Sequence, residues 1–402
     1  MPLSLLRLWT GPLPHQELFP DRKINPLLHW LIHPVKRRLA KYYLLILQKV
    51  FGLKVIAVTG SAGKTTLKNM LTSILKIEGP TVATRDNITP TYNIPSTIFR
   101  CPPGTRYLIL EMGIEYPGDM DFYTWLAQPD LGLILNVNRT HTQYLESISE
   151  VSAEKSKLLS ILPPTGFAIV NADDPNIKIE TSAPVSKFGT STDCYVQIKS
   201  SSLTPDFTTQ VEFLINHKSY VINLPLLGRH FSINAAAAAS AATLLDVRLQ
   251  NIIYGLEHTP SPPHRMQVIR LPQGPILIDD SYNANPLAVL ASLDTLAELA
   301  RITGLIPVLI FGQMNELGQY EKSAHEEIGL KIKNLKFKIL FCTGPATKHT
   351  IASAGFGQYF ESVDELTKAV SLALSTSHLA LIKASRSFHF ETVVDYLYSL
   401  HR

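Results

Sequence analysis

The stretch VIAVTGSAGKTT, residues 55–66, decides the fold of this chain. Its first residues are apolar and rich in β-branched side chains, which is typical of a buried parallel strand. A loop of glycines and small residues follows, and we expect a helix over 64–77. The backbone amides of such a loop point inward at a helix N-terminus and can cradle phosphate oxygens. The pattern therefore predicts a nucleotide-binding P-loop at TGSAGKTT (59–66).

Within this loop, Lys64 is expected to reach the β and γ phosphates and Thr65 to offer its hydroxyl to Mg²⁺. Val58 stands where the general pattern GxxxxGK[ST] has its first glycine, so the loop is a special variant. The residues expected to contact ATP here are Thr59, Gly60, Ser61, Ala62, Gly63, Lys64, Thr65 and Thr66.

Outward from the loop, strands and helices alternate. Apolar runs at 105–113 and 130–137 read as further strands, each next to a helical segment, and this alternation indicates a parallel α/β sheet. Short strands are expected within 193–225, with a hairpin turn at His217-Lys218, and an Ala-rich helix at 234–245. After a linker at SPPHR (261–265), a second doubly wound unit is predicted, with strands at 276–280, 307–312, 338–344 and 379–384.

The composition supports a folded chain of two or three domains. The 402 residues are 45% hydrophobic and 17% charged, so a large core can form and wholesale disorder is excluded. A net charge of +4, from 37 basic and 33 acidic residues, is too mild to indicate nucleic acid as the main partner. The three cysteines lie far apart and predict neither a zinc site nor a disulfide framework, which favours a reducing cytoplasm.

The N-terminal region reads as two segments before the P-loop strand. Residues 1–24 read as an irregular arm that makes a poor signal peptide, and 26–51 read as a helix that Pro34 is expected to split. No apolar run is long enough for a transmembrane helix. The helix combines many leucines with a basic cluster, so two interpretations stay open: packing on the next domain, or contact with a membrane surface or a lipid-linked substrate. The cluster consists of Lys36, Arg37, Arg38 and Lys41.

Three polar residues after the P-loop suggest a metal-assisted triphosphate site. Glu111 ends an apolar strand, His141 follows another strand, and Lys155 lies on a helical stretch. A carboxylate and an imidazole at the carboxyl ends of strands, near a phosphate loop, are sensible metal ligands. Taken singly, each has an ordinary interpretation: an edge residue, a loop residue and a solvated lysine.

Together, these landmarks resemble the Mur ligases, ATP-dependent enzymes of peptidoglycan precursor synthesis, and within them the dipeptide-adding subgroup. The family's P-loop, TG[ST]xGKT[ST], matches 59–66, and IDDSYNANP (278–286) is the most specific match. The resemblance covers about residues 53–402. Its other motifs are EMGIEYPGDM (111–120), LNVNRTHTQYLES (135–147), AEKSKLL (153–159), NADDP (171–175), LLGRHFSINAAAAA (226–239), PPHRMQ (262–267), FGQMNELG (311–318) with His325, and KASR (383–386).

The resemblance implies a domain plan and roles for single residues. It implies an N-terminal arm and helix (1–52), a central ATP-binding domain (53–262) and a C-terminal Rossmann-like domain (263–402). Thr65, Glu111 and His141 would bind Mg²⁺, together with Lys155 once that lysine is carbamylated, and Lys64, Glu111, His141 and Lys155 would be catalytic. Asn234 would face the adenine. Arg265 would contact a phosphate of ATP, and Asp280, Tyr282 and Asn283 would line the nucleotide.

By the same resemblance, the acceptor is UDP-N-acetylmuramoyl-tripeptide, the amine donor is D-alanyl-D-alanine, and the enzyme is a cytoplasmic monomer. The chain departs from the family in three places. No segment resembles the N-terminal domain that grips the UDP end, the loop after the P-loop helix reads NITPTYNIP (87–95), and Gln313 and Ala384 replace the usual Asp and Gly. Two alternatives stay open: a related ligase that acts on another carboxylate, such as a folate, and an ATP-binding scaffold without catalysis.

Overall fold

A computed structural model describes residues 32–85, 88–138, 145 and 147–401. The chain divides into two compact units. The first gathers the described residues up to Lys199 together with Glu212–Ile222 and Ile233–His258, and the second gathers Ser200–Val211, Asn223–Ser232 and the residues from Thr259 onward. Both units are α/β, as predicted, and each is described below by itself.

A nine-stranded sheet has the order β2-β3-β1-β4-β5-β6-β7-β8-β9. All pairs from β2 through β7 are parallel. The two residues between β8 and β9, Asn216 and His217, both have positive φ, as a two-residue hairpin turn requires, one position before the predicted turn. The strands are β1 Lys54–Thr59, β2 Thr81–Ala83, β3 Tyr107–Glu111, β4 Leu131–Ile134, β5 Phe167–Asn171, β6 Val185–Gly189, β7 Val196–Leu203, β8 Thr209–Ile215 and β9 Lys218–Leu224.

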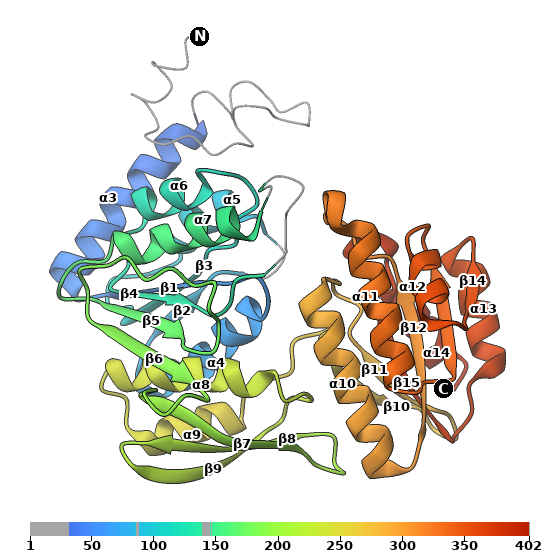
Figure 1. Cartoon of the computed structure of the whole chain (residues 1–402). Helices are drawn as coiled ribbons and strands as arrows, with labels where there is room; N and C mark the ends of the chain where they lie inside the picture. Colours follow the sequence, from blue (N-terminus) through green and yellow to red (C-terminus); the bar gives the residue numbers. More distant parts are fainter. Residues whose placement is uncertain (1–31, 86–87, 139–144, 146, 402) are drawn as a thin grey trace. The chain divides into compact units, whose positions relative to one another are not determined.

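Helices cover both faces of this sheet (Figure 1). One face carries α3, α5, α6 and α7 over a core of fully buried aliphatic and aromatic side chains, and the other carries α4, α8 and α9. Pro34 stands in the first turn of α3, so the described part of the predicted 26–51 helix runs unbroken. The helices are α3 His33–Phe51, α4 Lys64–Glu78, α5 Pro90–Ile98, α6 Asp119–Leu126, α7 Ile148–Ser160, α8 Phe231–Leu244 and α9 Leu249–Glu257.

The C-terminal sheet has the order β10-β11-β15-β12-β13-β14, and only β10 is antiparallel to its neighbour. Its helices lie on both faces, which confirms the predicted doubly wound arrangement. The strands are β10 Gln267–Arg270, β11 Ile276–Asp279, β12 Ile306–Gly312, β13 Ile339–Thr343, β14 Gln358–Phe360 and β15 His378–Lys383. The helices are α10 Pro286–Thr303, η2 Gly318–Tyr320, α11 Glu321–Asn334, α12 Thr347–Ala354, α13 Val363–Ala373, η3 Arg386–Phe388 and α14 Glu391–Ser399.

Several elements had no signal in the sequence. The strands β2 and β14 have three residues each, and β10 is a half-exposed edge strand, so none of them shows the apolar run of a central strand. Within the described residues, no helix is long and apolar enough to cross a membrane.

Candidate active site

The P-loop joins β1 to α4 through a glycine that no other residue could replace without strain. Gly63 is the N-cap of α4 and has φ +81°, in the left-handed region. A Cβ atom at Gly63 would lie 2.7 Å from Cδ2 of Leu135 and 2.8 Å from Nδ2 of Asn234. Gly63, as the N-cap residue, has no side chain that could cap the first amides of α4. The first amides of this helix therefore form an anion site of the kind that binds nucleotide phosphates.

Two asparagines after β4 hold the loop in place. The backbone amide of Ala62 donates to Oδ1 of Asn136 at 2.8 Å, and Nδ2 of Asn136 donates to the carbonyl oxygen of Ala62 at 3.1 Å. The backbone amide of Asn138 donates to Oγ of Ser61 at 2.8 Å. Asn136 and Asn138 were not predicted as site residues, although their position at the end of an apolar strand was a usable signal. They fix the loop before any ligand binds.

Lys64 and Lys155 converge on the loop from different helices. Nζ of Lys64 donates to the carbonyl oxygen of Gly60 at 2.8 Å, and Nζ of Lys155 donates to the same oxygen at 3.3 Å. Lys155 is buried, with 1% of its surface exposed. Burial lowers the pKa of Lys155 well below its usual range, and the charge of Lys64 lowers it further. Lys155 is therefore not a solvated helix lysine but a buried amine beside the phosphate loop.

Thr65, in the first turn of α4, contacts Glu111 at the carboxyl end of β3. Oγ1 of Thr65 donates to Oε1 of Glu111 at 3.0 Å. The other carboxylate oxygen, Oε2, lies 3.6 Å from Nζ of Lys68, a buried lysine one turn further along α4. Lys68 also donates to the carbonyl oxygen of Thr84 at 3.0 Å. Lys68 had no signal in the sequence, because its local pattern is that of any surface lysine of an amphipathic helix.

The side-chain oxygen atoms of Thr65 and Glu111 are of the kind that bind a magnesium ion. Hydroxyl and carboxylate oxygens beside a phosphate site are the ligands that Mg²⁺ uses with a bound triphosphate. His141, the third predicted ligand, lies outside the described residues. Among the residues that the structure describes, no three His, Cys, Asp or Glu side chains are grouped so that they could hold a metal ion by themselves.

Glu154, the residue before Lys155, holds the segment after Glu111 in place. Oε1 of Glu154 accepts hydrogen bonds from the backbone amides of Gly118 (3.0 Å) and Met120 (2.9 Å), and its other oxygen pairs with Lys157 at 2.6 Å. Glu154 is itself buried, so these partners satisfy a carboxylate that has left water. The contacts tie the helix of Lys155 to the start of α6 and fix where the lysine enters the site.

Asn234 also belongs to this cluster. It lies in the first turn of α8, and its Nδ2 donates to the carbonyl oxygen of Gly63 at 2.7 Å. The structure thus brings Asn234 against the P-loop, together with Lys64, Thr65, Glu111 and Lys155.

The predicted residues of the second unit form a separate group. The guanidinium carbon of Arg265 lies 3.9 Å from the ring centroid of Tyr282, a cation–π contact. The carboxylate of Asp280 pairs with the buried ammonium of Lys383 and accepts from Oγ of Ser292 at 2.7 Å. Nζ of Lys383 also donates to the carbonyl oxygen of Asn283 at 3.1 Å. Lys383 is thus the residue that holds the 280–283 segment together.

His325, which the resemblance named together with the FGQMNELG motif (311–318), is a structural residue. Its Nε2 accepts from the backbone amide of Met314 at 3.1 Å, and its Nδ1 lies 2.9 Å from Oγ1 of Thr350. Burial lowers the pKa of His325 to about 4, so the neutral imidazole can act as this acceptor. Gln313, which departs from the family pattern, bonds to Glu321 and to the backbone amide of Ala346. These contacts shape the loop after β12.

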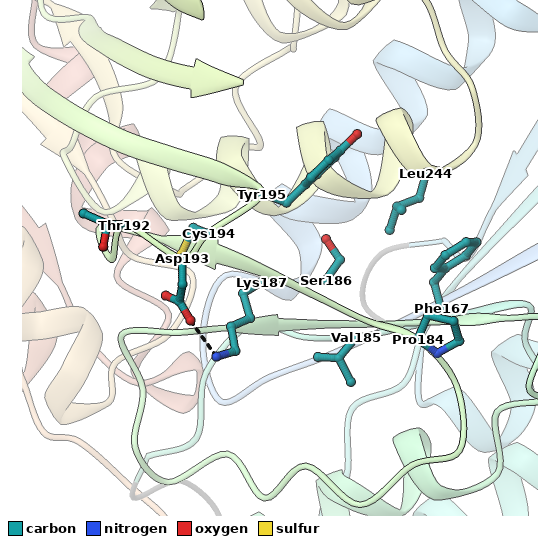
Figure 2. A pocket seen from close by; sticks show the side chains of 10 residues that line it. All are labelled: Phe167, Pro184, Val185, Ser186, Lys187, Thr192, Asp193, Cys194, Tyr195 and Leu244. Atoms are coloured by element: carbon teal, nitrogen blue, oxygen red, sulfur yellow. Dashed lines mark hydrogen bonds and ion pairs between the residues drawn. The ribbon is translucent and has the colours of Figure 1, made fainter. Parts of the chain in front are cut away.

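A cavity of about 500 Å³ lies elsewhere in the first unit (Figure 2). It is lined near the starts of β5 and β6 by Phe167 and Val185, and also by Lys187 and Asp193, which form an ion pair at 2.7 Å. The P-loop follows the carboxyl end of a strand in the same parallel sheet. The cavity therefore lies at the opposite edge from the P-loop and contains none of the predicted site residues.

Comparison with known proteins agrees with this fold. Residues 58–242 match the Mur ligase middle domain, and residues 264–386 match the Mur ligase, glutamate ligase domain. The chain belongs to the Mur ligase family, whose members are ATP-dependent ligases, and the predicted resemblance is confirmed.

Several relatives within this family have the same activity in their names. The chain is 32% identical to the UDP-N-acetylmuramoyl-tripeptide–D-alanyl-D-alanine ligase of Buchnera aphidicola subsp. Baizongia pistaciae, over 85% of this chain and 75% of the relative. It is 30% identical to the Escherichia coli K12 ligase of the same name, over 85% and 76%. The crystal structure of MurF from Acinetobacter baumannii superposes with a TM-score of 0.82 at 28% identity, covering 91% of this chain and 80% of that one. MurF from Thermotoga maritima in complex with ADP, at 23% identity and a TM-score of 0.82, shares the fold.

Proposed function

We propose that the protein joins D-alanyl-D-alanine to UDP-N-acetylmuramoyl-tripeptide in an ATP-dependent amide ligation. The observation that carries this proposal is the convergence of Lys64, Lys155, Thr65 and Glu111 on one P-loop, in a chain 32% identical to a ligase of that name. A P-loop alone supports nucleotide binding. The buried lysine and the carboxylate beside it support phosphoryl transfer to an acid.

The reaction has two steps. A carboxylate oxygen of the tripeptide attacks the γ-phosphorus of ATP, the bond to the bridging oxygen breaks, and ADP leaves. The amine of D-alanyl-D-alanine then attacks the acyl carbon, phosphate leaves, and the amine loses a proton. Phosphorylation is needed because a free carboxylate has no adequate leaving group. The ammonium of Lys64 and the amides at the start of α4 offset negative charge on the transferred phosphoryl group.

Mg²⁺ would be held by Thr65 and Glu111, with His141 as the further ligand that the sequence predicts. Bound there, it would neutralise charge on the triphosphate. Lys68 keeps Glu111 oriented, because its ammonium lies 3.6 Å from Oε2. Lys155 is proposed to carry a carbamate: its neutral amine forms a bond to the carbon of CO₂ and releases one proton. Burial favours this chemistry, since only the neutral amine is a nucleophile.

We further propose the division into an arm and helix (1–52), a central ATP-binding domain (53–262) and a C-terminal domain (263–402), and a cytoplasmic monomer. Asn234, Arg265, Asp280, Tyr282 and Asn283 are proposed as nucleotide contacts. Light scattering coupled to size exclusion measures the oligomeric state, and a dimeric mass would contradict that part of the proposal.

The experiment is ADP release by the purified chain with ATP and Mg²⁺. We expect release only when UDP-N-acetylmuramoyl-tripeptide and D-alanyl-D-alanine are both present, with the joined peptide detected by mass spectrometry. Release with a folate and glutamate would instead favour the related ligase, and no release with any pair would favour the scaffold. Lys64→Ala should abolish release, whereas Lys76→Ala, an exposed lysine on the same helix, should not.

A further inference from the structure

The helix α3 exposes an apolar stripe to solvent. Leu39, Tyr42, Ile46 and Val50 each expose between 51% and 69% of their surface. Their spacing of three, four and four residues places them on one face of the helix. We call these four residues the α3 stripe. Exposed apolar side chains at this regularity mark an interaction surface more often than scattered ones do.

The stripe is not the face that holds α3 on its unit. The opposite face carries Ala40, Leu44 and Leu47, each at most 1% exposed, within the core of the first unit. The helix also packs on α5 and α6, and Oη of Tyr43 donates to the carbonyl oxygen of Cys101 at 2.6 Å. The helix is therefore fixed in rotation, and its solvent-facing stripe serves no contact of the described core.

The charged residues of α3 itself are all basic. From Arg22 to Ile77 the sequence contains no Asp or Glu. At 100° per residue, Arg38 and Lys49 border the stripe on one side and Lys36 borders it on the other. An apolar strip between cationic borders complements a surface that is apolar below and anionic above.

We propose that the α3 stripe docks on the surface of an anionic lipid bilayer. The helix, about 28 Å long, would lie parallel to the membrane, with the stripe in the headgroup and upper acyl region and the cations at phosphate level. Docking leaves the core face of α3 undisturbed, because the two faces lie on opposite sides of the helix. The inference does not depend on the reaction proposed above.

Two other candidate partners of the α3 stripe complement its bordering cations less well. A second copy packed stripe to stripe would bring the bordering cations of both helices together, and neither α3 helix has an acidic residue to pair them. Residues 1–31 of the same chain carry three Arg or Lys against two acidic residues, so they offer no anionic complement either.

The test is flotation of the full chain with lipid vesicles. One set contains phosphatidylcholine alone, and the other contains equal parts of phosphatidylcholine and phosphatidylglycerol. The stripe variant is Leu39→Gln with Ile46→Gln, and its matched control is Leu372→Gln, an exposed leucine of α13. The charge variant is Lys49→Glu, with Lys368→Glu on α13 as control.

We expect the parent to bind the anionic vesicles. The stripe variant should reduce the partitioning about tenfold or more, and Lys49→Glu should reduce it several-fold. Both control variants should partition as the parent does, and every variant should release ADP in solution at the parent's rate. The proposal is overturned if the parent does not bind the anionic vesicles. It is equally overturned if the stripe variant binds as the parent does, which would place the contact elsewhere, or if light scattering shows a dimer that the stripe variant abolishes.

Discussion

Lys64 and Lys155 share one hydrogen-bond acceptor. Their Nζ atoms lie 2.8 Å and 3.3 Å from the carbonyl oxygen of Gly60, although the two residues belong to α4 and α7. Two ammonium groups this close in a buried site would repel each other, and the repulsion lowers the pKa of Lys155 in addition to burial. The arrangement favours a neutral amine at Lys155.

The first prediction concerns that neutral amine. In buffer supplied with ¹³C-labelled bicarbonate, the parent should show a carbamate carbon signal by NMR, and Lys155→Ala should lack it. Lys155→Ala should also slow ADP release by at least about a hundredfold, the magnitude typical of a lost electrostatic contact to the transition state. Lys76→Ala, an exposed lysine of α4, should retain the signal. A labelled carbamate that survives Lys155→Ala would assign the modification to another residue.

The second prediction concerns the positioning of Glu111 by Lys68. Lys68→Met removes the ammonium 3.6 Å from Oε2 of Glu111 and leaves the hydrogen bond from Thr65 to Oε1 in place. We expect the Mg²⁺ concentration that half-saturates ADP release to rise about tenfold, as for an oriented ligand that loses its support. Lys76→Met should leave this concentration unchanged. A Lys68→Met variant with the parent's Mg²⁺ dependence would make Lys68 a purely structural residue.

The third prediction concerns Gly63. Gly63→Ala places a Cβ atom at φ +81° and within 3 Å of Leu135 and Asn234, so the loop must shift. Nucleotide affinity, measured by calorimetry with ADP, should fall more than tenfold. Gly52→Ala is the matched control, because its φ is +69° but nothing lies within 4 Å of the added atom. Gly52→Ala should lower the unfolding free energy by about 1 kcal/mol and leave the affinity for ADP unchanged.

The fourth prediction concerns pH. The folded-state pKa of His325 is about 4, below its usual 6.5, so the native unit binds the proton less readily than the unfolded chain. Stability is therefore full above pH 6.5 and is lost as the pH falls toward 4, by about 2 kcal/mol between pH 7.5 and pH 5. Denaturant unfolding at both values measures it. Burial also lowers the pKa of His230 to about 4, so this residue contributes a loss of stability in the same pH range. The contribution of His325 is therefore measured with His325→Gln, whose unfolding free energy should change less between the two pH values than that of the parent. An equal slope in this variant would exclude His325 as the source.

The fifth prediction concerns Asp280. Asp280→Asn leaves the buried ammonium of Lys383 without its carboxylate and should lower the unfolding free energy by about 3–5 kcal/mol. Asp280→Asn combined with Lys383→Met should recover most of this loss. If the carboxylate also contacts nucleotide, as proposed, the double variant should be stable and bind ADP weakly. Full ADP affinity in the double variant would restrict Asp280 to a structural role.

The local pattern of the sequence determined the strand–loop–helix unit at 55–66, the two parallel α/β sheets and the family, because strand and helix periodicity, glycine placement and short motifs are set by neighbours in the chain. Glu111, Lys64 and Thr65 could be assigned for that reason. Only the tertiary structure decided that Lys155 is buried against Gly60, that Asn136 clamps the loop, that Lys68 supports Glu111 and that α3 presents an apolar stripe to solvent. Burial and partner choice depend on residues distant in sequence, and a lysine on an amphipathic helix has the same local pattern whether its ammonium ends in water or in a core.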